Sequence, residues 1–476
     1  MKGTLLERWE AARETSLYRL WGVLFGLGCL LLVLHLPLPE GLTEVGRRTA
    51  GVAVLMAVWW LGGVLPMSVT ALVPLVALPL MGVATAKGAA EPYAHPLNFL
   101  MLGGFVMGHA IEEVGLHKKI VVGLLSPRFI RARPRLVLLA MMCAAALLSG
   151  MVSNTATMVM MLPIAFTLAG TLSPDPSARS GFALALAYAC SIGGVATLIG
   201  TPPNAVLAGL SPRPIAFVDW MLIGVPFVLL ALPVAWLVVS RLALPKLSGV
   251  AGELPEVPDQ PGRRAVLAVL GAAMLAFLTR RGLGPIPAWG PELHDAWIAV
   301  AAAVALFMIP ARVGDRQTLL TWHRTERAIP WSVLLLLGGG FSLAAAITSS
   351  GLTAWLAGFT AQLGLLPGWV AVIGICLAIS FITELTSNTA TTQIALPLLA
   401  AGAGVAGVDP LLWMVPATIS ASCAFMMPVA TAPNAIACEA GGVEASKMAS
   451  VGVVLNLICA LIAAAVVLLI LPLLGL

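Results

Sequence analysis

The sequence predicts an all-α protein that crosses a membrane many times and consists of two related halves. Three observations predict this fold class. Of the 476 residues, 60% are hydrophobic and only 10% are charged, whereas soluble domains carry about 25% charged residues. Apolar stretches of about 20 residues, the length that spans a bilayer, recur along the chain. The tripeptide Ser153-Asn154-Thr155 returns as Ser387-Asn388-Thr389, at an offset of 388 − 154 = 234 residues.

The apolar segments predict about eleven membrane-spanning helices. The first residues lack the layout of a secretory signal peptide, so we expect the first segment to remain as a helix. The spans are expected near 19–37, 50–66, 67–83, 97–116, 181–210, 215–240, 264–280, 294–311, 329–352, 411–441 and 450–474. The chain is expected to divide into residues 1–49 with the first helix, a first repeat at 50–249, a Pro-, Gly- and Glu-rich linker at 250–263, and a second repeat at 264–476.

Residues 135–170 and 368–408 are expected to form two re-entrant hairpins. Each is a pair of apolar arms at or below spanning length, on either side of a Ser-Asn-Thr tip. Three adjacent polar residues in hydrocarbon are costly unless protein or ligand satisfies them. One such cluster would equally fit hydrogen bonding between membrane helices, but two copies in register indicate a duplicated site.

The distribution of Lys and Arg predicts the orientation of the hairpins. Cytoplasmic loops carry an excess of these residues. The loop before the first hairpin holds six of them, whereas residues 353–369 before the second hold none. The first hairpin should therefore enter from the cytoplasm and the second from outside, with a cytoplasmic N-terminus and an extracytoplasmic C-terminus. Arg280 and Arg281 fall on the expected outer side and count against this scheme.

Two further repeated motifs predict interrupted helices. Gly200-Thr201-Pro202-Pro203-Asn204 and Ala430-Thr431-Ala432-Pro433-Asn434 fall inside the segments 181–210 and 411–441. Proline removes a backbone donor and clashes with the preceding turn. An ordinary proline kink in each segment is the simpler interpretation. The repetition instead favours a break that divides each segment into two half-helices. Broken helices at corresponding positions of an inverted-topology repeat point to a transporter's binding site. We therefore expect further substrate contacts at Thr201, Pro202, Thr431 and Ala432.

Residue types and motifs that are absent from the sequence exclude several classes of protein. No Lys or Arg occurs in residues 137–178 or 328–446, so the expected site has no fixed cation. All six aspartates fall in loops or at span ends, which argues against an antiporter built on a midplane aspartate. The seven cysteines are isolated, and no zinc-enzyme motif is present. We expect no enzyme activity and no nucleic-acid partner. A lipid transferase would need clustered acids or a metal motif, and neither is present. A channel is disfavoured because re-entrant hairpins suit alternating access.

At the Ser-Asn-Thr motifs the chain resembles the divalent anion:sodium symporter (DASS) family. Its most specific parts are Ser191-Ile192-Gly193-Gly194 with the 200–204 motif, and Ser422-Cys423-Ala424-Phe425 with residues 428–434. The resemblance implies a homodimer, an elevator-like movement of the hairpin-bearing domain, and tips that hold the substrate carboxylates. It implies two sodium sites, one at Ser149, Ser153, Asn154 and Gly200 and the other at Thr383, Thr386, Asn388 and Ala430. Ala432 departs from the family, which usually has proline there.

The sequence therefore predicts a secondary active transporter in the inner (plasma) membrane, surrounded by membrane lipid. It would import a di- or tricarboxylate such as succinate, malate, fumarate or citrate together with two or more Na⁺. A sodium-independent dicarboxylate exchanger, a proton-coupled carrier, and a symporter of sulfate or another divalent anion remain as alternatives.

Overall fold

The computed structural model describes residues 16–245, 247, 249, 257–282, 287–290, 292–310 and 318–474. Every named element among them is a helix, and the one isolated β-bridge joins Pro310 and Thr318. The expected N-terminal segment before residue 16 and residues 250–256 of the expected linker lie outside the described residues.

The first half of the chain ends at a long apolar helix. Its helices are α2 (Ser16–His35), α3 (Glu44–Gly62), α4 (Met67–Thr70), α5 (Val73–Leu80), α6 (Ala86–Ala90), η1 (Glu91–Ala94), α7 (Pro96–Glu113), α8 (Leu116–Leu125), α9 (Arg128–Arg131), α10 (Pro134–Ser149), α11 (Asn154–Leu172), α12 (Ser177–Gly194), α13 (Pro202–Leu210) and α14 (Phe217–Leu242).

The last part of the second half follows the order of α7 to α14, with one additional 3-10 helix. The helices of this half are α15 (Arg263–Thr279), α16 (Asp295–Phe307), α17 (Trp322–Ala328), α18 (Trp331–Ser349), α19 (Leu352–Thr360), η2 (Ala361–Leu365), α20 (Gly368–Leu385), α21 (Asn388–Val405), α22 (Pro410–Ala421), η3 (Pro428–Ala430), α23 (Ala432–Glu439) and α24 (Ala445–Leu474). The pairs α7/α8 and α18/α19 each join at a glycine with positive φ, Gly115 (59°) and Gly351 (75°). Only glycine takes this left-handed conformation without strain.

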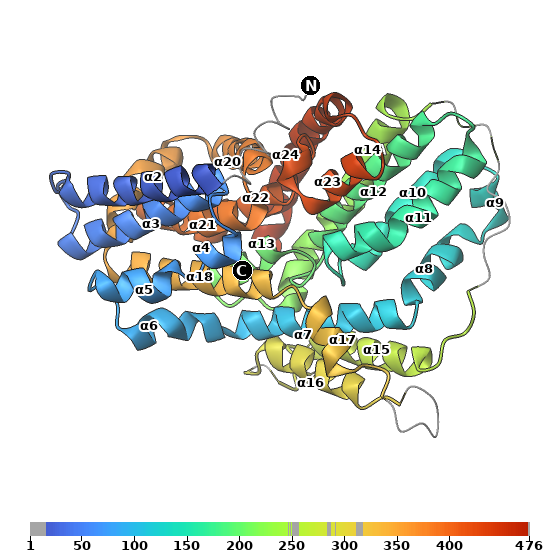
Figure 1. Ribbon diagram of the computed structural model, residues 1–476, viewed down its shortest axis with the longest axis horizontal. Helices are drawn as coiled ribbons and strands as arrows, with labels where there is room; N and C mark the ends of the chain where they lie inside the picture. Colours follow the sequence, from blue (N-terminus) through green and yellow to red (C-terminus); the bar gives the residue numbers. More distant parts are fainter. Residues whose placement is uncertain are drawn as a thin grey trace.

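Both predicted hairpins are helix–turn–helix units. Their arms contain 16 and 19 residues in the first unit and 18 each in the second. The first tip ends where Ser153 caps α11, its hydroxyl accepting a hydrogen bond from Ala156 N at 3.2 Å. Both predicted interruptions are present as well, between Gly194 and Pro202 and between Ala421 and Ala432. Figure 1 shows α13, α22 and α23 near the centre of the molecule, between the two hairpins.

The expected span at 67–83 is a shorter apolar helical segment, Met67–Leu80, with a break inside it. Residues 67–83 form two short helices, α4 and α5, with a break after Thr70. The cause is Pro74, which has no N–H to donate to the Thr70 carbonyl. Helix α18 packs closely at this break: a Cβ on Gly339 would lie 2.3 Å from the Ala71 carbonyl oxygen.

Six described helices are long and apolar enough to cross a membrane, or seven if the pair Ala86–Glu113 and Leu116–Leu125, bent by 68°, is one span. Several others, α10 among them, are apolar but shorter. The expected count of eleven spans, the re-entrant course of the hairpins and the inverted orientation of the halves therefore stay predictions.

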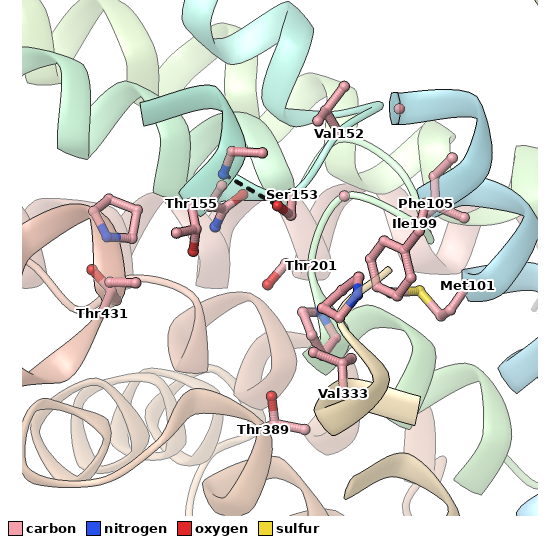
Figure 2. A pocket seen from close by; sticks show the side chains of 18 of the residues that line it. Met101, Phe105, Val152, Ser153, Thr155, Ile199, Thr201, Val333, Thr389 and Thr431 are labelled. Atoms are coloured by element: carbon pink, nitrogen blue, oxygen red, sulfur yellow. Dashed lines mark hydrogen bonds between the residues drawn. The ribbon is translucent and has the colours of Figure 1, made fainter. Parts of the chain in front are cut away.

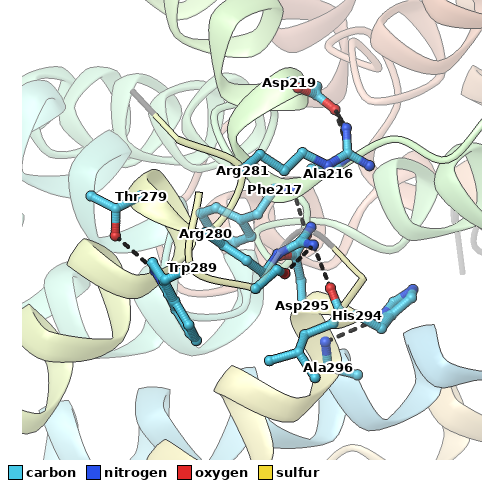
Figure 3. A network of polar contacts seen from close by, with 12 residues as sticks. Ala216, Phe217, Asp219, Thr279, Arg280, Arg281, Trp289, His294, Asp295 and Ala296 are labelled. Carbon is cyan, nitrogen blue, oxygen red and sulfur yellow. Dashed lines mark hydrogen bonds and ion pairs between the residues drawn. The ribbon is translucent and has the colours of Figure 1, made fainter. Parts of the chain in front are cut away.

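Arg280 and Arg281 both pair with acids (Figure 3). Arg280 Nε lies 2.7 Å from Asp295 Oδ1, and both side chains are 4% exposed. Asp295 also accepts from Phe217 N at 2.6 Å. Arg281 Nη1 lies 2.6 Å from Asp219 Oδ2. The two arginines thus form ion pairs at a junction of α14, α15 and α16, and their place on the expected outer side still counts against the predicted orientation.

Candidate functional site

Both hairpin tips and both helix interruptions line one cavity of about 620 Å³. Figure 2 shows Thr155 and Thr431 on one side of this space, and Met101 and Phe105 on the other. All ten predicted substrate residues line it: Ser153, Asn154, Thr155, Thr201, Pro202, Ser387, Asn388, Thr389, Thr431 and Ala432. Segments more than 200 residues apart in sequence therefore share one site.

Four helices point their N-termini at this cavity. The first residues of α11, α13, α21 and α23 are all part of its lining. A helix N-terminus carries unpaired N–H groups and a partial positive charge of about half an elementary charge. Four of them around one space favour an anion there without any cationic side chain, although Pro202, Pro203 and Pro433 carry no N–H. The lining indeed includes no Lys or Arg, and its titratable side chains are His109 and Glu112.

A buried hydroxyl stands behind each tip asparagine. Ser149 Oγ lies 2.5 Å from Asn154 Oδ1 and 2.7 Å from the Cys190 carbonyl oxygen. In the second half, Thr383 Oγ1 lies 2.7 Å from Asn388 Oδ1 and 3.1 Å from the Ala421 carbonyl oxygen. Both hydroxyl residues are fully buried. Each hydroxyl therefore links its hairpin tip to the last turns of the helix that precedes the interruption, α12 in the first half and α22 in the second.

The asparagine that closes each interruption motif shapes the loop before it. Asn204 Nδ2 donates to the carbonyls of Gly194 (3.0 Å) and Thr197 (2.7 Å). Asn434 Nδ2 donates to the corresponding carbonyls of Ala424 and Met427, both at 3.0 Å. Both side chains are fully buried, and the Oδ1 atom of each has no hydrogen-bond partner in the described part of the chain. These two residues were not predicted as site residues, although each ends a repeated motif.

Gly194 and Gly200 bring the first loop against Asn154. A Cβ on Gly194 would lie 2.5 Å from Asn154 Oδ1, and one on Gly200 would lie 2.4 Å from the Gly194 carbonyl oxygen. A side chain at Gly200 would require the backbone to move, and one at Gly194 would displace the Asn154 side chain. The amide oxygen of Asn154 is thus surrounded by a hydroxyl and a tightly wound loop.

In the second half only, a buried carboxylate accepts hydrogen bonds from the loop between α22 and α23, called the second loop below. Glu384, 3% exposed, accepts hydrogen bonds at Oε1 from Phe425 N (2.7 Å) and Met426 N (2.9 Å), and at Oε2 from Met427 N (2.9 Å). Asn456 Nδ2 donates a fourth, at 2.7 Å. The position at the repeat offset, 384 − 234 = 150, is a glycine whose carbonyl oxygen accepts from the Thr197 hydroxyl. The two halves therefore differ by one buried acid.

The predicted sodium ligands fall into three groups. Ser153, Asn154, Gly200, Asn388 and Ala430 line the cavity. Ser149 and Thr383 lie behind it and contact the tip asparagines. Thr386 does not line it: its hydroxyl lies 3.0 Å from the Ile382 carbonyl oxygen and 2.5 Å from Thr391 Oγ1. Except for Thr386, the set is an assembly of hydroxyl, amide and carbonyl oxygens, the hard ligands that suit Na⁺.

The wall formed by α7 was not predicted. Met101, Phe105, His109 and Glu112 contribute to it from successive turns, and Val333 of α18 adds to it. No polar motif marks these positions in the sequence.

Comparison with known proteins agrees with this architecture. Residues 55–418 match the model of the citrate transporter family. The sodium-dependent dicarboxylate transporter SdcS of Staphylococcus saprophyticus is 35% identical over 490 residues, covering 97% of this chain and 93% of that protein. Its namesake from Staphylococcus aureus (strain MRSA252) is 33% identical over 494 residues, covering 98% and 94%.

A solved structure shows the same fold. The YdaH transporter of Alcanivorax borkumensis superimposes with a TM-score of 0.60 at 18% identity, covering 89% of this chain and 98% of that one. The relatives and the matched family are transporters and not enzymes. With three quarters of its length matched by one family model, the chain belongs to the citrate transporter family.

Proposed function

We propose that the protein is a secondary active transporter that imports a di- or tricarboxylate, of the succinate, malate, fumarate or citrate class, together with Na⁺. The observation that carries this proposal is the convergence of four helix N-termini on a cavity whose lining has no Lys or Arg. Relatives at 33–35% identity over nearly the full length are sodium-dependent dicarboxylate transporters, which supports the substrate class and the coupling ion.

Each hairpin tip holds one end of the substrate. Asn154 and Asn388 each present an amide, with two donors and an acceptor, to the same cavity from opposite halves of the chain. A dicarboxylate has an anionic group at each end, which matches a site built from two equivalent tips. Thr201 and Thr431, at the starts of α13 and α23, supply further hydroxyls.

Sodium supplies the positive charge that the side chains lack. Moving a dianion into a negative-inside cell costs about 2.3 kcal/mol per charge per 100 mV, or about 4.6 kcal/mol in total. Two Na⁺ cancel this cost, and the duplicated oxygen clusters around Ser149 and Thr383 support one ion in each half. A third ion would make uptake electrogenic.

Transport proceeds by an elevator-like movement. The hairpins and interrupted helices contact one another closely, and α7, α17 and α18 form the opposite wall of the cavity. Displacement of one group against the other would change the side from which the cavity opens. In this proposal the hairpins are re-entrant, the halves are inverted, the protein is a homodimer in the plasma membrane, the N-terminus is cytoplasmic and the C-terminus extracytoplasmic.

Uptake of labelled succinate into proteoliposomes tests the function. We expect an inward Na⁺ gradient to drive uptake with a sigmoidal dependence on sodium, and K⁺ or choline to give background rates. Asn154→Ala and Asn388→Ala should each abolish uptake by a correctly assembled protein. Uptake at equal rates in all three media would instead favour a sodium-independent exchanger, and near-normal uptake by both variants would contradict the two-tip site.

A further inference from the structure

A second cavity, of about 830 Å³, lies where α10 begins and α14 ends. The two helices contact each other, and Trp236 of α14 donates from Nε1 to the Arg135 carbonyl oxygen at 2.7 Å. The start of α10 is thereby fixed against the last turns of α14. This cavity shares no residue with the site between the hairpin tips.

The lining of the cavity is basic. Arg133, Arg135 and Arg241 contribute to it, and no Asp or Glu does. None of the three has an ion-pair partner within the described residues. All three are exposed residues, so a phosphate group that enters the cavity from solvent can meet their guanidinium groups. Guanidinium is also the side chain best suited to bidentate contacts with phosphate oxygens.

Its position places the cavity at a membrane surface. α14 has 26 residues and is one of the helices that can cross a bilayer, so its last turn at Leu242 lies at the boundary with water. Trp236 lies six residues earlier, about 9 Å deeper at 1.5 Å per residue. Tryptophan with an apolar body and a polar edge is typical of this depth. Leu136 and Leu244 make the remaining wall apolar.

A buried polar group without a partner also lies at this cavity. Ser240 lines it, is 9% exposed, and has a hydroxyl with no hydrogen-bond partner in the described part of the chain. A helical serine usually donates to the carbonyl four residues earlier, and this one does not. An unsatisfied buried hydroxyl is costly, and a ligand oxygen would satisfy it.

We propose that this cavity binds the phosphate of an anionic phospholipid. The three arginines contact the phosphate oxygens, Ser240 donates to one of them, and the acyl chains follow the apolar wall formed by Leu136 and Leu244. The proposal does not depend on the proposed transport function. A free phosphate ion has the same charged oxygens, so the experiment separates the two sources.

The test measures lipid retention by the purified full-length protein. Native mass spectrometry counts phosphatidylglycerol and phosphatidylcholine bound from matched nanodiscs, and a titration with short-chain lipid gives the affinity. The test variant is Arg133→Gln/Arg135→Gln/Arg241→Gln. The control is Lys118→Gln/Lys119→Gln/Arg128→Gln, which removes the same charge from exposed positions outside the cavity. A parallel titration uses inorganic phosphate alone.

We expect wild type and the control to retain phosphatidylglycerol in preference to phosphatidylcholine. Each lost arginine should weaken binding about fivefold, and all three on the order of 100-fold. Ser240→Ala, which keeps every charge, should weaken phosphatidylglycerol binding severalfold. If the triple variant does not fold, Ser240→Ala and the single variant Arg241→Gln provide the test. Equal loss in the control would show general charge attraction and overturn the proposal. Retention of phosphatidylcholine as strongly as phosphatidylglycerol, or displacement of the lipid by equimolar inorganic phosphate, would overturn it too.

Discussion

Glu384 is the residue at which the two halves of the site differ most. Its carboxylate accepts four hydrogen bonds, three of them from the backbone of residues 425–427 just before Ala430. Hydrogen bonds to a charged group contribute about 1.5–3 kcal/mol each. The acid therefore holds the second loop in shape, at a position where the first half has Gly150.

Replacing Glu384 with Gln should destabilise the protein and weaken its response to sodium. The amide keeps the volume but turns one acceptor into a donor that faces N–H groups, so at least one hydrogen bond is lost, at a cost of about 1.5–3 kcal/mol. We expect a lower unfolding temperature in detergent and a higher sodium concentration for half-maximal uptake. Glu439→Gln, at an exposed position of α23, is the control for loss of charge. An unchanged sodium response in Glu384→Gln would contradict the role given to the carboxylate.

At the scale of elements, the orientation of the hairpins is the open question, and labelling can answer it. In a background without the seven native cysteines, Ser153→Cys should react mainly with reagents added on the cytoplasmic side and Ser387→Cys mainly with external ones. The reason is the excess of Lys and Arg before the first hairpin and their absence before the second. Ser126→Cys and Gln362→Cys, both exposed in the flanking connections, are the controls for each side. Labelling of both tips from one side only would exclude the inverted arrangement.

The elements themselves could be predicted closely from the sequence. The predicted hairpins at 135–170 and 368–408 correspond to helical arms from Pro134 to Leu172 and from Gly368 to Val405. Prolines and polar tips mark such boundaries because they change backbone hydrogen bonding directly. The break between α4 and α5 was missed because a proline inside an apolar run equally fits a kinked single helix.

At the scale of the whole molecule, both halves are needed to form the cavity. Arm α11 of the first hairpin contacts α23 of the second half, and α21 of the second hairpin contacts α13 of the first. The four helix N-termini at the cavity come two from each half. The motifs predicted which segments form the site. The α7 wall could not be predicted, because the spacing of Met101, Phe105 and Glu112 shows a helix face but not what that face meets.

Splitting the chain tests whether both halves are needed to form the site. Residues 1–256 and 257–476 expressed separately should each fail to transport, because each exposes the surfaces that the other covers. Co-expressed, they should copurify and recover a substantial fraction of sodium-driven uptake. A split after Ala187, inside the buried helix α12, is the control and should not recover. Transport by either half alone would refute the shared site.

The exchange of contacts between the halves also has a consequence for any shorter form of this chain. A chain of half this length has one tip, one interrupted helix and two of the four N-termini, with the apolar surfaces of α11 and α13 uncovered. Such a half would need a partner that supplies the other tip and the other two N-termini to close the cavity. Joining both halves in one chain fixes that pairing and lets the two sides of the cavity differ, as Glu384 and Gly150 do.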